Sequence, residues 1–205
     1  MLSIANLNVS ISAVHILRGV SLELPAGSMT GLIGRNGAGK TTLIKTVMGL
    51  LKPGSGGLRF EDKDLLAVPT HARARLGIGY MPEDRRLIPE LTVEENILLP
   101  AWAAGVRDAD ARLRKILEYV PEIRELVARK GAQLSGGQQK LAALARALMC
   151  GTRLLLLDEP FEGVAPALAQ RVLAFYDGRI IADAPPAVAL QDPEVKRHVV
   201  GRARA

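Results

Sequence analysis

Apolar and polar residues alternate along the first part of the chain. Near-alternating apolar positions over 2–11 and 20–24 predict two strands of an antiparallel sheet. A short apolar run over 29–33 predicts a buried strand. Behind it, apolar residues recur at helical spacing between Leu43 and Leu51, so we expect a helix to follow this strand.

The rest of the pattern changes between helix and strand several times. Thr92 and Glu95 have the spacing of a capping box and open a helical subdomain over about 91–150, in which 122–130 are expected to be helical too. We also expect strands over 58–60, 76–81 and 154–157, a hairpin over 171–182 with an Asp-Gly turn, and short helices over 185–190 and 193–200. Together these elements predict an α/β fold.

Composition narrows the class of protein. At 205 residues the chain suits one domain, or one domain with a subdomain. With 48% hydrophobic residues it can bury a sizeable core. No apolar run approaches the roughly 18 residues needed to cross a bilayer, and no signal peptide is recognisable. Because Cys150 stands alone, no internal disulfide is expected, and we predict a cytosolic protein.

The net charge of +6 would suit nucleic acid or an anionic membrane surface as a partner. However, the basic residues are scattered along the chain, and only 3% of the residues are aromatic and able to stack on bases. We therefore expect no nucleic acid among the partners.

The first chemical motif joins the strand over 29–33 to the helix behind it. It has the pattern G-x-x-x-x-G-K-T of a phosphate-binding P-loop and comprises Gly34, Arg35, Asn36, Gly37, Ala38, Gly39, Lys40, Thr41 and Thr42. Glycines let successive N–H groups point at a phosphate, and the helix N-terminus adds partial positive charge. We expect Lys40 to reach the β- and γ-phosphates of ATP and Thr41 to bind Mg²⁺. The alternative is a glycine turn that binds nothing.

A second glycine-containing helix start is Leu134-Ser135-Gly136-Gly137-Gln138. Ser135 and Gln138 have the spacing of a capping box. The N–H groups of Gly136 and Gly137 then lie at a helix N-terminus, which suits an anion. Taken alone, an ordinary capped helix without a ligand explains this segment better.

Two carboxylates end the apolar run over 154–157. The run has the length of a central parallel strand, so Asp158 and Glu159 are expected at the crevice beyond the sheet. Asp158 is the candidate for the Mg²⁺ shell, and Glu159 is the candidate catalytic base that polarises the attacking water. A charged turn at the strand end is the alternative.

In this order, the P-loop, Leu134–Gln138 and Leu154–Pro160 resemble the ATP-binding subunits of ABC transporters over nearly the whole chain. Leu-Ser-Gly-Gly-Gln is similar to the signature motif of that family. Residues 80–86 resemble the Q-loop, and 162–166 the D-loop, of the ATPase subunits of branched-chain amino-acid importers. The resemblance implies a P-loop NTPase fold of ABC type, with a mostly parallel core sheet, an N-terminal antiparallel sheet and a helical subdomain.

The resemblance also implies a mechanism. Two ATPase subunits pair head to tail, and each ATP, with Mg²⁺, lies between the P-loop of one and the signature motif of the other. Transmembrane permease subunits are the implied partners, and the protein would lie in the cytoplasm against the inner face of the cell membrane. The residues implied to contact nucleotide beyond the P-loop are Glu83 of the Q-loop and Ser135, Gly136, Gly137 and Gln138 of the signature motif. The residues implied to face the permease are Glu83, Leu87, Ile88, Pro89 and Trp102.

Four features depart from the family's pattern. The aromatic residue that usually stacks on adenine falls near Ile11. Glu83 replaces the usual Gln of the Q-loop, although the most similar subfamily often has Glu, and Phe161 replaces a small polar residue of the D-loop. Between about 166 and 171 the family's switch-loop segment, roughly 35–45 residues with two helices and a strand, is missing.

Two functions are the main candidates, and a third class of protein is also considered. The first is the ATP-hydrolysing subunit of an ABC importer for branched-chain amino acids or a related small solute. The second is an ABC module that binds nucleotide with little or no turnover, because the missing segment carries the residue that senses the γ-phosphate. A soluble ABC ATPase acting on DNA or ribosomes is a third class, which usually has extra or duplicated domains. The transported solute and the choice between homodimer and heterodimer stay open.

Overall fold

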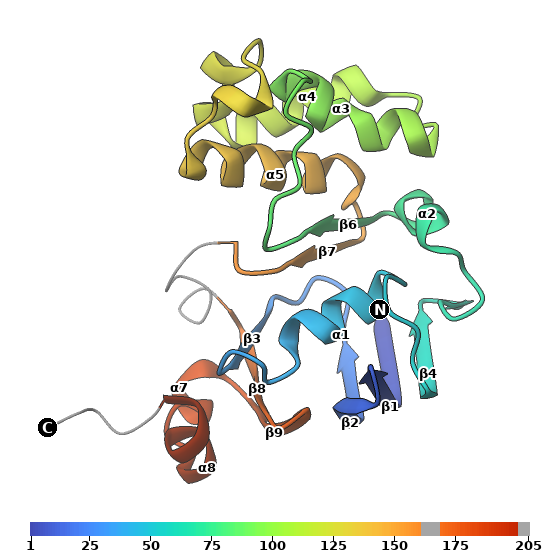
Figure 1. The fold of residues 1–205 in the computed structure, drawn as a ribbon, viewed down its shortest axis with the longest axis vertical. Coiled ribbons are helices and arrows are strands. Elements are labelled where there is room, and N and C mark those ends of the chain that lie inside the picture. The colour runs from blue at the N-terminus through green and yellow to red at the C-terminus, as the bar shows by residue number, and fades with distance from the viewer. Residues whose placement is uncertain (161–168, 201–205) are drawn as a thin grey trace, which may run out of the picture. The chain divides into compact units, whose positions relative to one another are not determined.

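The computed structural model describes residues 1–160 and 169–200, and only the backbone of Val200. The chain forms two compact units, which are described separately below (Figure 1). One unit combines Met1–Pro69 with the residues from Phe161 onwards, and the other is Thr70–Pro160. The predicted helical subdomain falls within the second unit. The D-loop resemblance at 162–166 and the departure at Phe161 lie outside the described residues.

An antiparallel sheet in the order β2-β1-β4-β5 forms part of the first unit. Its strands are β1 (Leu2–Ile11), β2 (Val14–Leu24), β4 (Ser55–Phe60) and β5 (Lys63–Asp64). Ile4 pairs with Leu22 on one side and Leu58 on the other, and all three are buried, which confirms the predicted sheet. β4 begins earlier than predicted because Gly57 and Ser55 also pair with β1, opposite Ala5 and Asn8. A Cβ on Gly56 would lie 2.5 Å from the Asn6 carbonyl oxygen, so glycine allows this close pairing.

A second sheet of the first unit carries the P-loop. Its order is β3 (Thr30–Gly34), β8 (Arg171–Tyr176) and β9 (Arg179–Ala184), with β3 parallel to β8. β8 and β9 form the predicted hairpin around Asp177 and Gly178. The helix α1 (Lys40–Val47) follows β3. α7 (Pro186–Ala189), α8 (Pro193–Val195) and a π-helix over Lys196–Val200 stand where two short helices were predicted.

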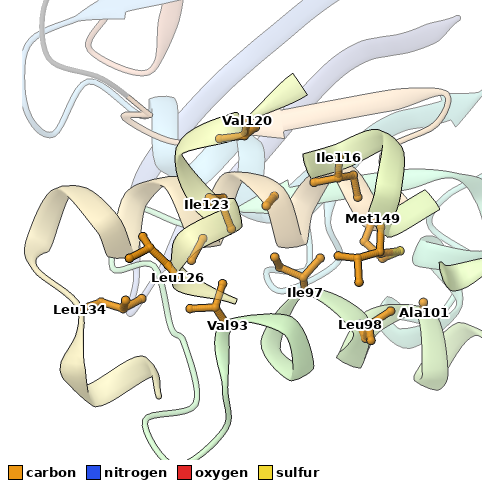
Figure 2. Packing of buried hydrophobic residues seen from close by; sticks show 13 residues of the cluster. Val93, Ile97, Leu98, Ala101, Ile116, Val120, Ile123, Leu126, Leu134 and Met149 are labelled. Carbon is orange, nitrogen blue, oxygen red and sulfur yellow. The ribbon is translucent and has the colours of Figure 1, made fainter. Parts of the chain in front are cut away.

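The second unit combines a parallel pair of strands with several helices. The strands are β6 (Ile78–Met81) and β7 (Leu154–Leu157), and α2 (Thr70–Arg73) and the 3-10 turn η1 (Ala74–Leu76) precede β6. Along the chain, the segment from β6 to β7 forms α3 (Val93–Ala104), α4 (Ala109–Tyr119), the 3-10 segments η2 (Pro121–Leu126) and η3 (Gly131–Gln133), and α5 (Gly136–Cys150). Apolar side chains of α3, α4, η2 and α5 meet in one buried cluster that includes Ile97, Ile116, Ile123 and Met149 (Figure 2).

The prediction of a helix over 122–130 is wrong in its extent. Only the short 3-10 segment Pro121–Leu126 forms. The carbonyls of Val127 and Arg129 accept hydrogen bonds from the N–H groups of Glu94 and Val93 at 3.0 Å and 2.9 Å. These hydrogen bonds join the segment after η2 to the start of α3, whose first N–H groups have no partner within the helix.

In the described residues, β3 pairs in parallel with β8 within the first unit, and β6 pairs in parallel with β7 within the second. None of the helices in this part of the chain has the length and apolar character needed to cross a membrane.

Candidate nucleotide site

The predicted P-loop is a tight turn between β3 and α1. Gly37 and Gly39 have φ values of 80° and 110°, a region in which residues with a Cβ are strained. α1 begins at Lys40, directly after Gly39. The Lys40 ammonium group folds back over the loop and donates to the Gly34 oxygen at 2.7 Å and the Arg35 oxygen at 3.2 Å. A lysine at this place can exchange such carbonyl contacts for a phosphate.

Close packing explains two of the loop's glycines. A Cβ on Gly34 would lie 2.7 Å from the Phe175 carbonyl oxygen, and one on Gly39 would lie 2.7 Å from Leu17 Cδ2. A Cβ on Gly37 would meet nothing within 4 Å. Gly37 is therefore required by its φ value rather than by space.

The turn between β8 and β9 is hydrogen-bonded to the P-loop. The Gly178 N–H donates to the Ala38 oxygen at 3.2 Å, and the Arg18 N–H donates to the Gly178 oxygen at 2.9 Å. The Arg18 guanidinium pairs with the Asp177 carboxylate at 2.9 Å. A Cβ on Gly178 would lie 2.0 Å from the Ile16 oxygen, so only glycine fits. The sequence indicated this turn but not its contact with the P-loop.

No aromatic side chain is found at the end of the β1–β2 hairpin, where the family usually stacks adenine. Ile11 and Val14 face each other across this hairpin, with 41% and 59% of their surface exposed. In the described part of the first unit, Phe60 and Phe175 are buried, and Tyr176 stacks on His198 with ring centroids 4.0 Å apart.

The signature residues start α5 as predicted. Ser135 Oγ accepts from the Gln138 N–H at 3.4 Å, and the Ser135 N–H donates to Gln138 Oε1 at 3.0 Å, which forms the predicted capping box. Since Ser135 Oγ is an acceptor here, its hydrogen is free to be donated to a ligand. A Cβ on Gly137 would meet nothing within 4 Å, so this position is open on its outer side.

The predicted Q-loop starts in β6 with Tyr80 and Met81, and its other residues lie in a connection that we call the strap, Pro82–Leu91. Glu83 is exposed within it. The buried Asn96 of α3 fixes the strap, because its Oδ1 accepts from the Ile88 N–H at 2.8 Å and its Nδ2 donates to the Ile88 oxygen at 3.0 Å.

Arg146 of α5 fixes the strap at a second point. Its guanidinium donates to the Arg86 oxygen at 2.6 Å and to the Arg85 oxygen. Arg85 and Arg86 both have positive φ, at 61° and 46°. The Arg85 side chain reaches Gln139 Oε1 at 3.4 Å and lies 3.4 Å from where a Cβ of Gly136 would be. The strap and the signature helix are therefore linked within one unit.

Asp158 and Glu159 follow β7 in different environments. The Asp158 N–H donates to the Met81 oxygen at 2.9 Å and so extends the β6–β7 pairing. Asp158 is buried, with 2% of its surface exposed. Glu159 is exposed and has a φ of 50°. A left-handed conformation at a residue other than glycine is frequent at functional sites, which fits a role for Glu159.

Tyr80, the first residue of the predicted Q-loop, was given no role of its own from the sequence and lies beside this carboxylate end. Burial, followed by the negative charges of Asp158 and Asp84, raises the pKa of Tyr80 to about 12. Its hydroxyl is buried and has no hydrogen-bond partner among the described residues. Two features of the sequence pointed to Tyr80: its place in the Q-loop resemblance over 80–86, and its polar hydroxyl near the end of the strand predicted over 76–81.

The predicted site residues thus divide between the two units. The P-loop belongs to the first unit, and Glu83, the signature residues, Asp158 and Glu159 belong to the second. A profile of the family described as ABC transporter matches residues 17–162. The chain belongs to this family.

Three relatives of known name are similar over most of the chain. The high-affinity branched-chain amino acid transport ATP-binding protein BraG of Pseudomonas aeruginosa is 37% identical over 177 residues, 86% of this chain and 76% of BraG. The probable branched-chain amino acid transport ATP-binding protein LivF of Archaeoglobus fulgidus is 35% identical over 181 residues, 86% of this chain and 77% of LivF. The lipopolysaccharide export system ATP-binding protein LptB of Escherichia coli is 31% identical over 233 positions, 98% of this chain and 97% of LptB.

Solved structures confirm the predicted ABC-type fold. An ATP-binding subunit of an ABC transporter has a TM-score of 0.82 at 24% identity, over 98% of this chain and 96% of that one. The ADP conformation of MJ1267, an ATP-binding cassette of an ABC transporter, has a TM-score of 0.77 at 28% identity, over 95% of this chain and 96% of MJ1267. The predicted membership of the ABC transporter ATP-binding subunits is therefore confirmed.

Proposed function

We propose that the chain is the ATP-binding and ATP-hydrolysing subunit of an ABC importer for branched-chain amino acids or a related small solute. The observation that carries the proposal is the P-loop itself, with Lys40 folded over the loop at the start of α1. The similarity to BraG and LivF supports the choice of solute class. LptB, which is 31% identical, belongs by its name to an export system. Inward transport of the solute is therefore part of the proposal.

Each group of residues has its own role in the proposed binding and hydrolysis of ATP. The P-loop N–H groups and Lys40 hold the phosphates of ATP, and Thr41 and Asp158 hold Mg²⁺. The buried Asp158 carboxylate suits this role, because Mg²⁺ in nucleotide sites takes one or two carboxylates together with phosphate oxygens. When bound, Mg²⁺ neutralises charge that develops on the phosphates. The exposed Glu159 polarises the water that attacks the γ-phosphate.

A second subunit completes the proposed site. Its Ser135, Gly136, Gly137 and Gln138 face the γ-phosphate bound to the first subunit, and Glu83 of the strap senses the nucleotide. The pair works with transmembrane permease subunits at the cytoplasmic face of the membrane. Ile88 and Trp102 are 37% and 56% exposed, which leaves apolar surface for that contact.

Loss and restoration of uptake test the proposal. A strain lacking the gene should lose uptake of labelled leucine, isoleucine and valine. The parent chain should restore uptake, and the Lys40→Ala variant should not. Unchanged uptake of all three amino acids in the deletion strain would contradict the assignment to branched-chain amino acids, and it would not bear on nucleotide binding.

A specific observation also favours the alternative function, nucleotide binding with little turnover. The alignment with LptB runs over 233 positions, which exceeds the 205 residues of this chain by 28. We infer that residues 1–205 are one ABC nucleotide-binding domain, in which the switch-loop segment with its strand is missing between about 166 and 171.

A further inference from the structure

Tyr80 and Asp158 lie on the same face of the β6–β7 pair. The two strands are parallel, and Tyr80 is opposite Leu156. Paired residues of neighbouring strands share a face, and side chains two residues apart in a strand do so as well. Asp158 continues the pairing through its hydrogen bond to the Met81 oxygen. The phenol is therefore a neighbour of the carboxylate proposed for the metal site.

The Tyr80 hydroxyl is anomalous for a folded interior. It is buried without a hydrogen-bond partner among the described residues. Nearly all buried polar groups have a partner, and an exception calls for an explanation such as an ordered water or an ion. The partner of Tyr80 must therefore be something that the chain itself does not supply in this part of the structure.

The charges around the hydroxyl indicate which partner fits. Asp158, Asp84 and Glu83 all act on this phenol as negative charges, and only Arg86 opposes them. A phenol hydroxyl can both donate and accept hydrogen bonds. A hydroxyl beside a carboxylate is therefore suited to bind a water of a metal shell.

We propose that Tyr80 is a positioning residue of the metal site, whose hydroxyl oxygen accepts a hydrogen bond from a water of the Mg²⁺ shell beside Asp158. Mg²⁺ usually keeps several of its waters when it binds with a nucleotide. Residues that bind such waters orient the shell, and their loss typically weakens metal binding tenfold to a hundredfold. The inference rests on the proposed function, because it assumes that Mg²⁺ binds at Asp158 with a nucleotide.

The test compares Tyr80→Phe with the parent chain and with Tyr119→Phe as a matched control. Tyr119 is 73% exposed on α4, so its variant makes the same chemical change away from the site. Binding of Mn²⁺ in the presence of the non-hydrolysable analogue adenylyl imidodiphosphate is measured by electron paramagnetic resonance. We expect Mn²⁺ affinity to fall about tenfold for Tyr80→Phe and to stay unchanged for Tyr119→Phe.

Two further readouts separate positioning from a structural role. The ligand-free Tyr80→Phe variant should melt at the same temperature as the parent or higher, because the change removes a buried hydroxyl that has no partner among the described residues. Its affinity for the analogue in the presence of EDTA should equal that of the parent. A residue that merely supports the fold would show a lower melting temperature and equal losses with and without metal.

The outcomes of these measurements separate the role of Tyr80 from the proposed function on which that role rests. Equal Mn²⁺ affinities of the parent and Tyr80→Phe would overturn the role of Tyr80 alone. Equal losses of analogue affinity with and without metal would overturn it too. A parent chain that binds the analogue neither with nor without Mn²⁺ would overturn the proposed nucleotide site, and the inference with it.

Discussion

At the scale of single residues, nucleotide binding depends most directly on Lys40. Its ammonium group now contacts the Gly34 and Arg35 oxygens and is placed to bind a phosphate instead. The Lys40→Ala variant should lose a charge-assisted contact of about 1.5–3 kcal/mol, or roughly tenfold to a hundredfold in affinity. Titration with labelled ATP measures this. Lys45→Ala, the same change later in α1, is the control, and equal affinities of the two variants would contradict the site.

Selectivity for the base is a second prediction at this scale. Ile11 and Val14 occupy the hairpin end where an aromatic residue would stack on adenine. Without stacking, little distinguishes the purine bases, so ATP and GTP should bind within about tenfold of each other, or ~1.4 kcal/mol. Competition against a labelled nucleotide checks this. A hundredfold preference for ATP would show that another group recognises the base.

At the scale of elements, the start of α5 carries the prediction about pairing. A Cβ on Gly137 would meet no atom within 4 Å, and a carboxylate in the first turn of a helix is favourable for the helix itself. Gly137→Asp should therefore fold normally but repel the γ-phosphate bound to a second subunit. Light scattering should report an ATP-dependent dimer for the parent and for the neutral Gly137→Asn variant. Dimers of Gly137→Asp at the same ATP concentration would show that the signature role is wrong.

The strap provides a prediction about stability. Arg146 holds two consecutive left-handed residues, Arg85 and Arg86, by their carbonyl groups. Arg146→Met should lower the free energy of unfolding by about 2 kcal/mol, because charged hydrogen bonds contribute about 1.5–3 kcal/mol. Arg86→Gly should recover about 1 kcal/mol in that background, since glycine adopts positive φ without strain. Urea unfolding of both single variants and the double variant checks this, and a double variant no more stable than Arg146→Met would contradict it.

The same scale shows how much the sequence could reveal. The P-loop, the capping boxes at Thr92 and Ser135, and the Asp-Gly hairpin were predictable because each is specified by residues next to one another. The contacts of Arg146 with the strap and of Gly178 with the P-loop join residues far apart in the sequence. The pairing of the segment after η2 with the start of α3 likewise joins residues far apart in the sequence, and the predicted helix over 122–130 did not allow for it.

At the scale of the whole molecule, the parallel strands offer a prediction about solubility. Within its own unit, β7 is hydrogen-bonded to β6 alone among the described residues. Leu155, Leu156 and Leu157 are only partly buried. Exposed strand edges with apolar residues favour aggregation. We expect the isolated chain to be poorly soluble, and size-exclusion chromatography of the purified protein checks this. A monodisperse preparation at high concentration would contradict it.

The central expectation for the whole molecule is that it binds Mg²⁺ and ATP through its P-loop and hydrolyses ATP slowly. In-line attack requires the water and the γ-phosphate to be held together, and the family's switch residue contributes to that geometry. The most direct measurement is phosphate release per monomer at saturating Mg²⁺ and ATP, with Glu159→Gln as the blank. We predict release well below that of a relative with the complete segment. Robust release that depends on Glu159, from a soluble preparation and at the rate of such a relative, would contradict this expectation.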